Sequence, residues 1–267
     1  MKVKLKLMGK IFVRSIESSS IGNSIVLYDN QTNLFLDFGS QNTNIENYFK
    51  KYNVNKKQIA AALITHYHLD HIRSIGKNSS REITFYASLP TIEYIKEHHL
   101  KDIKHSAINF VDVPINSRKW IKINNSSWKI KTFKTMHNAV GSIGYVIKNK
   151  NKKILYFTDS EPIENKLFKK LDAYIVESNY ATQYLDNIHQ ESKHIKDKIN
   201  HMNIYDAEKF FLKYKSKKMK IFIFSHLSKN GDKVKKLMDD MVKKYQSKGY
   251  NLKYINPFEI LKFEDSF

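Results

Sequence analysis

Four side chains able to bind metal crowd into six residues, in the pattern His66-x-His68-x-Asp70-His71. A chain of this make-up should contain such a pattern by chance in roughly 1 case in 1000. The pattern follows an apolar run at residues 59–64, which predicts a strand buried on both faces. Residues two apart in extended backbone point the same way, so His66 and His68 can share one ion, and Asp70 and His71 can turn toward a second. The alternative is a polar loop of surface histidines, and the rarity of the pattern argues against it.

Imidazole and carboxylate groups together suit zinc, and manganese or iron also accept them. Four ligands do not saturate two ions, so the pattern demands further ligands downstream. Three residues qualify, because each follows an apolar segment that predicts a strand: His137, Asp159 and His226. Polar residues at strand ends are where folds of this kind build their sites. The sequence therefore predicts a metal site assembled from several strand ends.

The length and composition are those of a folded protein with a sizeable core, and we expect one domain over residues 1–267. No stretch approaches the roughly 18 apolar residues of a membrane span, and the first ten residues do not have the pattern of a signal peptide. There is no cysteine, which excludes disulfides and thiolate ligands. We expect a cytoplasmic protein without a membrane partner.

The net charge of +20 would attract polyanions. Only four of the 46 basic residues are arginine, so part of the excess reflects a general abundance of lysine on a solvated surface. The excess is nevertheless uneven, with 17 lysines against 6 acidic residues between Lys193 and Tyr254. A basic C-terminal third beside a metal site favours a phosphate-bearing substrate over a role in solubility alone.

The periodicity predicts strands in both halves of the chain, each set followed by helices. The expected strands cover residues 3–14, 24–28, 34–37, 59–64, 83–86, 108–113, 128–135, 143–148, 153–158, 172–177 and 220–224. Helices are expected at 43–51, 91–100, 206–214 and 234–245, the first opened by a capping box from Thr43 to Glu46. This order predicts an α/β fold with two sheets packed face to face and covered outside by helices.

The chain resembles the metallo-β-lactamase superfamily, whose pattern is His-x-His-x-Asp-His followed by a His, a bridging Asp and a final His. The resemblance implies a four-layer αβ/βα sandwich, in which two packed mixed sheets are flanked by helices and the metals lie at one edge. It implies that His66, His68 and His137 hold the first ion, and that Asp70, His71 and His226 hold the second. Asp159 would bridge two divalent ions, Zn²⁺ or Mn²⁺.

Three further segments resemble the WalJ/YycJ-type branch, which is linked to exonuclease activity. They are Ser18-Ser19-Ser20-Ile21-Gly22-Asn23-Ser24, the stretch from Asp172 to Tyr180, and His226-Leu227-Ser228-Lys229-Asn230. The tRNA 3′-processing relatives in the superfamily carry a His and a Glu at places matching His201 and Glu177, where the pair helps to protonate the leaving oxygen. The alternative is a packing role for His201 and a surface position for Glu177.

Together these features predict a dinuclear metal-dependent phosphodiesterase, an exonuclease-like nuclease acting on DNA or RNA through a metal-bridging hydroxide. Asp70 would orient that hydroxide, His201 held by Glu177 would protonate the leaving group, and lysines around 193–220 would steer the anionic substrate. A phosphodiesterase for cyclic nucleotides or other small molecules is the alternative. A lactamase or thioesterase is less favoured, because Glu177, His201 and the basic C-terminal third would have no evident use in it. A nucleic-acid-binding protein with a degenerate site is disfavoured by the complete set of ligands. The sequence leaves a homodimer open.

Overall fold

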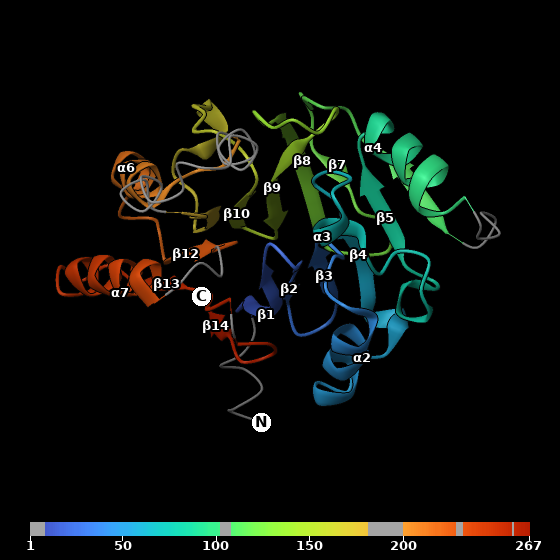
Figure 1. The fold of residues 1–267 in the computed structure, drawn as a ribbon, viewed down its shortest axis with the longest axis horizontal. Coiled ribbons are helices and arrows are strands. Elements are labelled where there is room, and N and C mark those ends of the chain that lie inside the picture. The colour runs from blue at the N-terminus through green and yellow to red at the C-terminus, as the bar shows by residue number, and fades with distance from the viewer. Residues whose placement is uncertain (1–8, 102–107, 181–199, 228–231, 258) are drawn as a thin grey trace, which may run out of the picture.

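The computed structural model describes residues 9–101, 108–180, 200–227, 232–257 and 259–267. Two seven-stranded sheets form its centre (Figure 1). The strands are β1 (Phe12–Ser19), β2 (Gly22–Tyr28), β3 (Asn33–Leu36), β4 (Ile59–Leu63), β5 (Thr84–Ala87), β6 (Asn109–Asp112), β7 (Ile121–Lys122), β8 (Trp128–Lys134), β9 (Ile143–Asn149), β10 (Lys152–Phe157), β11 (Ala173–Glu177), β12 (Ile221–Ser225), β13 (Leu252–Tyr254) and β14 (Glu264–Ser266). The helices are α2 (Asn42–Lys51), α3 (Leu69–Ile72), α4 (Leu89–Tyr94), α6 (Ile204–Tyr214) and α7 (Asp232–Gln246).

Both sheets are mixed. The first has the order β14-β1-β2-β3-β4-β5-β6 and the second the order β13-β12-β11-β10-β9-β8-β7. Strands β1, β2 and β3 form an antiparallel meander, and β9 and β10 form a hairpin. Strands β3 to β6 run parallel, as do β10 to β13, so the carboxyl ends of neighbouring strands meet at shared sheet edges.

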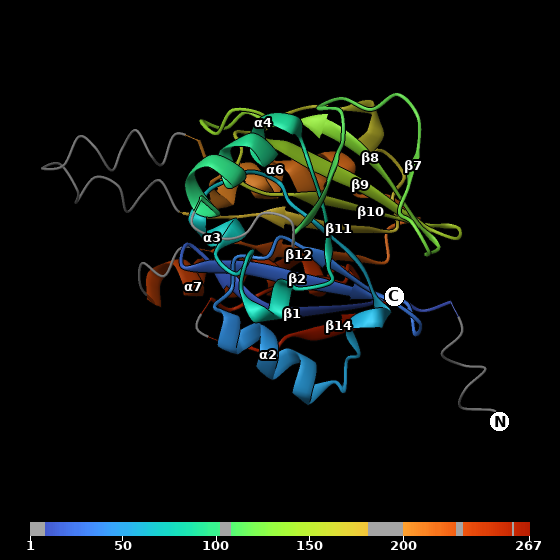
Figure 2. The same ribbon diagram turned by 90° about the vertical axis from the view of Figure 1, so that its right-hand side faces the viewer.

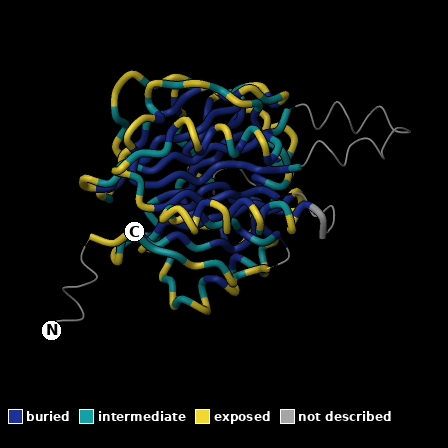
Figure 3. Tube along the Cα trace, turned by 90° about the vertical axis from the view of Figure 1, so that its left-hand side faces the viewer, coloured by how far each residue is buried: buried dark blue, intermediate teal, exposed yellow. Residues whose placement is uncertain are grey.

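The alternation of side chains along buried strands creates three apolar layers. In β12, Ile221 and Ile223 lie in the core between the two sheets, whereas Phe222 and Phe224 pack with α6 and α7 outside the second sheet. A third cluster joins the outer face of the first sheet to α2, α3 and α4. Figure 1 shows the sandwich of helix, sheet, sheet and helix, with α6 and α7 outside one sheet and α2 and α4 outside the other. Figure 2 views it from the side of α2, α3 and α4, and Figure 3 shows the buried residues concentrated in its middle. The predicted four-layer fold is confirmed.

Several predicted element boundaries were wrong. Helix α2 begins at Asn42, and the expected capping box at Thr43 is absent, because the first turn is held by other bonds: the Asn42 side chain donates to Glu46 and accepts from Ser79. The helix expected at 91–100 begins earlier, at Leu89, and becomes a π-helical turn over Ile95–His99. The first strand extends to Ser19, and residues 3–8 of its predicted range lie outside the described residues.

Among the described residues, no helix combines the length and the apolar character that crossing a membrane requires.

Candidate metal centre

Strand ends bring the seven predicted ligands together, although they are spread from position 66 to position 226. His66 follows β4, His137 follows β8, Asp159 follows β10 and His226 follows β12. Helix α3 begins directly after His68 and carries Asp70 and His71. Asp159 and His226 both have a positive φ, 48° and 53°, which non-glycine residues rarely adopt. Such strained backbone clusters at functional sites, where the surrounding structure holds it in place.

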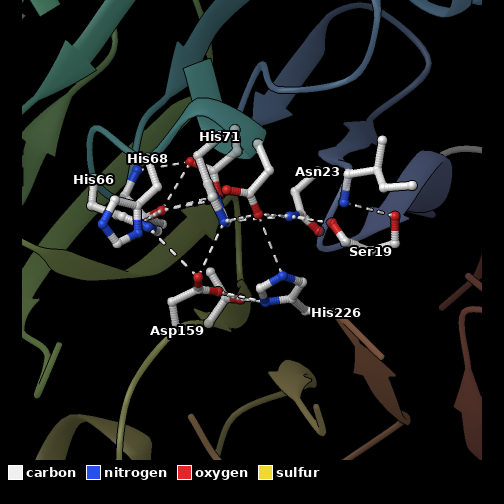
Figure 4. A network of polar contacts seen from close by, with 12 residues as sticks. Ser19, Asn23, His66, His68, His71, Asp159 and His226 are labelled. Atoms are coloured by element: carbon white, nitrogen blue, oxygen red, sulfur yellow. Dashed lines mark hydrogen bonds and ion pairs between the residues drawn. The ribbon is translucent and has the colours of Figure 1, made fainter. Parts of the chain in front are cut away.

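The seven side chains form two overlapping groups of potential ligand atoms. One contains His66, His68, His137 and Asp159, and the other contains Asp70, His71, Asp159 and His226. Asp159 Oδ2 lies 3.6 Å from His66 Nε2 and 3.3 Å from His71 Nε2. Figure 4 shows this carboxylate between the His66–His68 pair and His226. A single oxygen is therefore placed to belong to both groups.

The distances between these atoms fit metal coordination. Atoms held about 2.0–2.1 Å from one tetrahedral zinc ion lie roughly 3.3 Å from one another. His68 Nδ1 is 3.1 Å from His137 Nε2, and Asp70 Oδ2 is 3.1 Å from His71 Nε2 and 3.5 Å from His226 Nε2. The buried Nε2 atoms of His66 and His226 have no hydrogen-bond partner among the described residues. Unpaired buried nitrogens are costly, so a cation is the natural partner of this set.

The three histidines of the first group are held in the neutral form. Burial lowers the pKa of His66 and of His68, and burial lowers the pKa of His137 to about 4. A neutral imidazole has the lone pair that binds a metal. The first group therefore needs no deprotonation at neutral pH to accept a cation.

The second group is surrounded by negative charge. Burial opposes a proton on His71, but the carboxylates of Asp70, Asp159 and Asp37 raise its pKa well above the ordinary value. Burial likewise opposes a proton on His226, but the adjacent Asp159 raises the pKa of that ring. A divalent cation would compete with these protons, because the same carboxylates attract both.

Asp37 is a further residue of the site, which the sequence did not predict. It is fully buried, lies just past β3 and also has a positive φ. Its Oδ2 is 2.8 Å from His71 Nδ1, and it accepts hydrogen bonds from the hydroxyls of Tyr156 and Thr65. The Thr65 hydroxyl in turn lies 3.0 Å from His66 Nδ1. Asp37 thus holds the far nitrogen of His71 directly and that of His66 through Thr65, and Nε2 of each ring faces the cluster.

The segment from Ser18 to Ser24 supports the cluster from the β1–β2 hairpin. The Ser18 hydroxyl accepts a hydrogen bond from the backbone N–H of His226, 2.8 Å away. The Asn23 amide nitrogen donates to Asp70 Oδ2 over 3.0 Å and to the Ser19 carbonyl over 2.9 Å. These bonds give the segment a physical role: it positions His226, which follows β12, and Asp70, which lies in α3. Residues 228–230 of the third resembling segment lie outside the described residues.

Glu177 and His201 lie at the edge of the cluster as a bonded pair. Glu177 is 1% exposed, so it is not a surface residue, and its Oε1 is 2.5 Å from His201 Nδ1. Burial opposes a proton on His201, but the Glu177 carboxylate raises the pKa of the ring. The His201 ring centre is 5.5 Å from that of His137 and 5.6 Å from that of His226. The pair is close enough to act on a molecule held at the cluster.

The family model described as "Beta-lactamase superfamily domain" matches residues 35–226, which hold all of these side chains except those of the β1–β2 hairpin. The chain belongs to the beta-lactamase superfamily. It is accordingly a metallo-β-lactamase-fold hydrolase, and its His/Asp cluster is suited to divalent metal. The predicted family and enzyme class are confirmed.

Curated relatives within the superfamily carry the names expected from the sequence. The chain is 23% identical over 177 residues to "Exodeoxyribonuclease YycJ" of Bacillus anthracis, covering 64% of this chain and 63% of that relative, just under two thirds of its length. It is 22% identical over 224 residues to "Exodeoxyribonuclease WalJ" of Streptococcus pneumoniae serotype 2, covering 81% of each. The predicted resemblance to the WalJ/YycJ branch is confirmed.

Solved structures share the fold over nearly the whole chain. The metallo-β-lactamase fold protein YhfI from Bacillus subtilis aligns with a TM-score of 0.68 at 17% identity, covering 97% of this chain and 99% of its own. A diphosphatase from the PhnP family aligns with a TM-score of 0.69 at 14% identity, covering 97% of each. At these identities the likeness establishes the fold.

Proposed function

We propose that this protein is a dinuclear metal-dependent phosphodiesterase, a nuclease of the exonuclease type that acts on DNA or RNA. The observation that carries the proposal is the position of Asp159 Oδ2, within 3.3–3.9 Å of ligand nitrogens in both groups. His66, His68 and His137 would hold one ion, Asp70, His71 and His226 the other, and Asp159 both. The exodeoxyribonuclease names of the two curated relatives support nucleic acid as the substrate.

Two divalent ions, Zn²⁺ or Mn²⁺, would supply a water molecule acidic enough to ionise near neutral pH, and positive charge opposite the phosphate oxygens. Asp70 is the ligand whose carboxylate keeps some exposure, 18% of its side chain, so it can also accept a hydrogen bond from the attacking water. The other carboxylates of the cluster are enclosed by the protein. On this ground we propose that Asp70 orients the nucleophile.

His201 is suited to give a proton to the departing alkoxide. Its Nδ1 is engaged by Glu177, and its ring is 18% exposed, so the rest of the ring can meet a substrate. Glu177 keeps the ring protonated at a pH where a free histidine would already lose its proton. Glu177 is itself fixed by the backbone N–H groups of Ser160 and Met202, each 3.2 Å from its Oε2.

We propose a cytoplasmic location, because the two curated relatives are named as exodeoxyribonucleases of bacteria, whose DNA lies in the cytoplasm. We also propose that residues 1–267 form one domain, because β14 at the end of the chain pairs with β1 near its beginning.

The proposal is tested with the purified chain and Mn²⁺ or Zn²⁺ on labelled single-stranded and double-stranded oligonucleotides and on cyclic mononucleotides. Cleavage of oligonucleotides, reduced at least about 100-fold in Asp159→Ala, is the expected result. The matched control is Asp112→Ala, which removes an exposed carboxylate of β6 and should retain the activity. Turnover of the cyclic nucleotides alone would replace the nuclease with the alternative function, and an active Asp159→Ala would contradict the metal mechanism.

A further inference from the structure

A small pocket opens between α3 and α4, directly beside the cluster. Its volume is about 240 Å³, and its wall includes His68, Leu69 and Ile72 on one side and Tyr94, His98 and His99 on the other. His68 belongs to both the pocket and the first ligand group. A molecule in this pocket would therefore be one imidazole ring away from the site where the phosphate is cleaved.

The pocket contains a ladder of aromatic rings. Tyr67 stacks on Tyr94 with ring centres 3.8 Å apart and planes 17° apart, and Tyr94 stacks on His98 at 4.3 Å and 17°. The Tyr67 hydroxyl accepts a hydrogen bond from the backbone N–H of Val140, 3.3 Å away, which ties the ladder to the loop that carries His137. The π-helical turn places His98 over Tyr94, and π-turns occur often at functional sites.

The chemistry of the wall fits a flat, uncharged group. The seven described residues that line the pocket include no Lys, Arg, Asp or Glu, so the pocket offers little to a phosphate. Three of the nine large hydrophobic side chains exposed in the described part of the chain lie here or directly beside a metal-ligand candidate: Leu69, Tyr94 and Met136. Aromatic rings and apolar contacts are what proteins use to hold unpaired bases, because every base has a π face.

We propose that this pocket binds one unpaired nucleobase of the substrate, next to the phosphate that is cleaved. The inference rests on the proposed nuclease function and sharpens it, since a base inside a duplex is paired and stacked and cannot enter. The enzyme would then act on a single-stranded end, or on a strand opened at its end. Tyr67 and His98 cover the two faces of Tyr94, so the base would pack on Leu69 and against the exposed edge of this ladder while the phosphate lies at the cluster.

The test compares complete and abasic substrates, each cleaved by the native chain and by variants of the pocket. Single-stranded oligonucleotides are compared with the same strands carrying an abasic tetrahydrofuran residue at the 5′ end, the 3′ end or both, with Mn²⁺ present. The native chain should cleave the complete strand at least roughly tenfold faster, as kcat/KM, than the strand that lacks the bound base. Tyr94→Ala should reduce that preference to below about threefold, and Tyr94→Phe, which keeps the ring, should restore it. Leu212→Ala, an exposed apolar residue of α6, is the control and should preserve both rates.

The outcomes separate the two proposals. A native chain that cleaves complete and abasic strands equally well overturns the base pocket and leaves the nuclease standing. The same conclusion follows if Tyr94→Ala slows both substrates by one common factor, because that is the effect of a structural defect. A native chain that cleaves no oligonucleotide overturns the nuclease and the pocket together.

Discussion

At the scale of single residues, several side chains of the site depend on a neighbour that fixes their orientation. Asp37 holds the far nitrogen of His71, Asn23 holds Asp70, and Glu177 holds His201. Partners of this kind set the tautomer and direction of a ring before a ligand arrives. Their removal should therefore weaken the site without deleting any ligand.

Asp37→Asn tests whether removing such an orienting neighbour weakens the metal site. The change keeps the shape of the side chain but loses the charge facing His71 and the acceptor shared by Thr65 and Tyr156. We expect the affinity for Zn²⁺ to fall by about 10- to 100-fold, measured by competition with a chelating dye. Asp112→Asn, an exposed position, should not change the affinity. Equal affinities for the Asp37 variant and the native chain would show that the orientation of His71 does not depend on this carboxylate.

His201→Ala tests proton donation through the choice of leaving group. An oligonucleotide leaves as a basic alkoxide, and its cleavage should slow by about 100-fold or more. Bis(p-nitrophenyl) phosphate has a leaving group that needs no proton, so its hydrolysis should slow by less than about tenfold. Equal losses on the two substrates would contradict a role as general acid.

Glu177→Gln tests the same pair through pH. The carboxylate raises the pKa of His201, so the proton is available up to a higher pH than in an isolated histidine. With glutamine that pKa should fall, and kcat/KM for an oligonucleotide should begin to decline at a lower pH on the basic side of the profile. A basic limb at the same pH in both proteins would argue against His201 as the titrating group.

At the scale of elements, the sequence predicted most of the strands, and the ligand candidates at their ends, because alternation and apolar runs are local signals. The short edge strands β7, β13 and β14 were missed, since two or three residues carry no periodicity. The capping box at Thr43 was wrong because long-range bonds from Ser79 changed the first turn of α2. Asp37 could have been recognised, since it follows an apolar strand just as Asp159 does. Its partners Thr65 and Tyr156 could not, because only the packed sheets bring them together.

The contact between the β3–α2 loop and α3 should tolerate substitution less than most contacts in the fold. A Cβ built on Gly39 would lie 1.7 Å from the Asp70 carbonyl oxygen. Relieving this clash would require backbone atoms to move, which is energetically costly. Gly39→Ala should cost at least about 2 kcal/mol of unfolding free energy in urea and lower metal affinity by displacing Asp70 and His71. Gly249→Ala, with a φ of 82° and nothing within 4 Å, should cost about 1–2 kcal/mol and leave metal binding intact. A stable Gly39→Ala protein with native metal affinity would contradict this packing.

At the scale of the whole molecule, metal binding, folding and pH are linked. The carboxylates that raise the pKa values of His71 and His226 let these rings stabilise the folded chain while protonated, a contribution lost as the pH rises through those values. A cation must displace those protons, so it should bind more tightly as the pH rises. We expect Mn²⁺ to raise the melting temperature more at about pH 8 than at about pH 6, by calorimetry. A metal-induced shift that is larger at the lower pH would contradict the linkage.

The basic C-terminal third is partly neutralised within the fold. Five of its lysines form ion pairs with carboxylates: Lys209, Lys213, Lys218, Lys244 and Lys253. Residues 193–199, at the start of the predicted steering region, lie outside the described residues. Electrostatic steering by this third stays a prediction, and its signature would be a cleavage rate that falls steeply with salt.

The most direct test of the central claim is an anomalous difference map from crystals of the chain grown with Mn²⁺. The arrangement of the ligands predicts two peaks about 3.5–4 Å apart that share Asp159, one contacting His66, His68 and His137 and the other contacting Asp70, His71 and His226. A single peak, or two peaks that do not share Asp159, would contradict it.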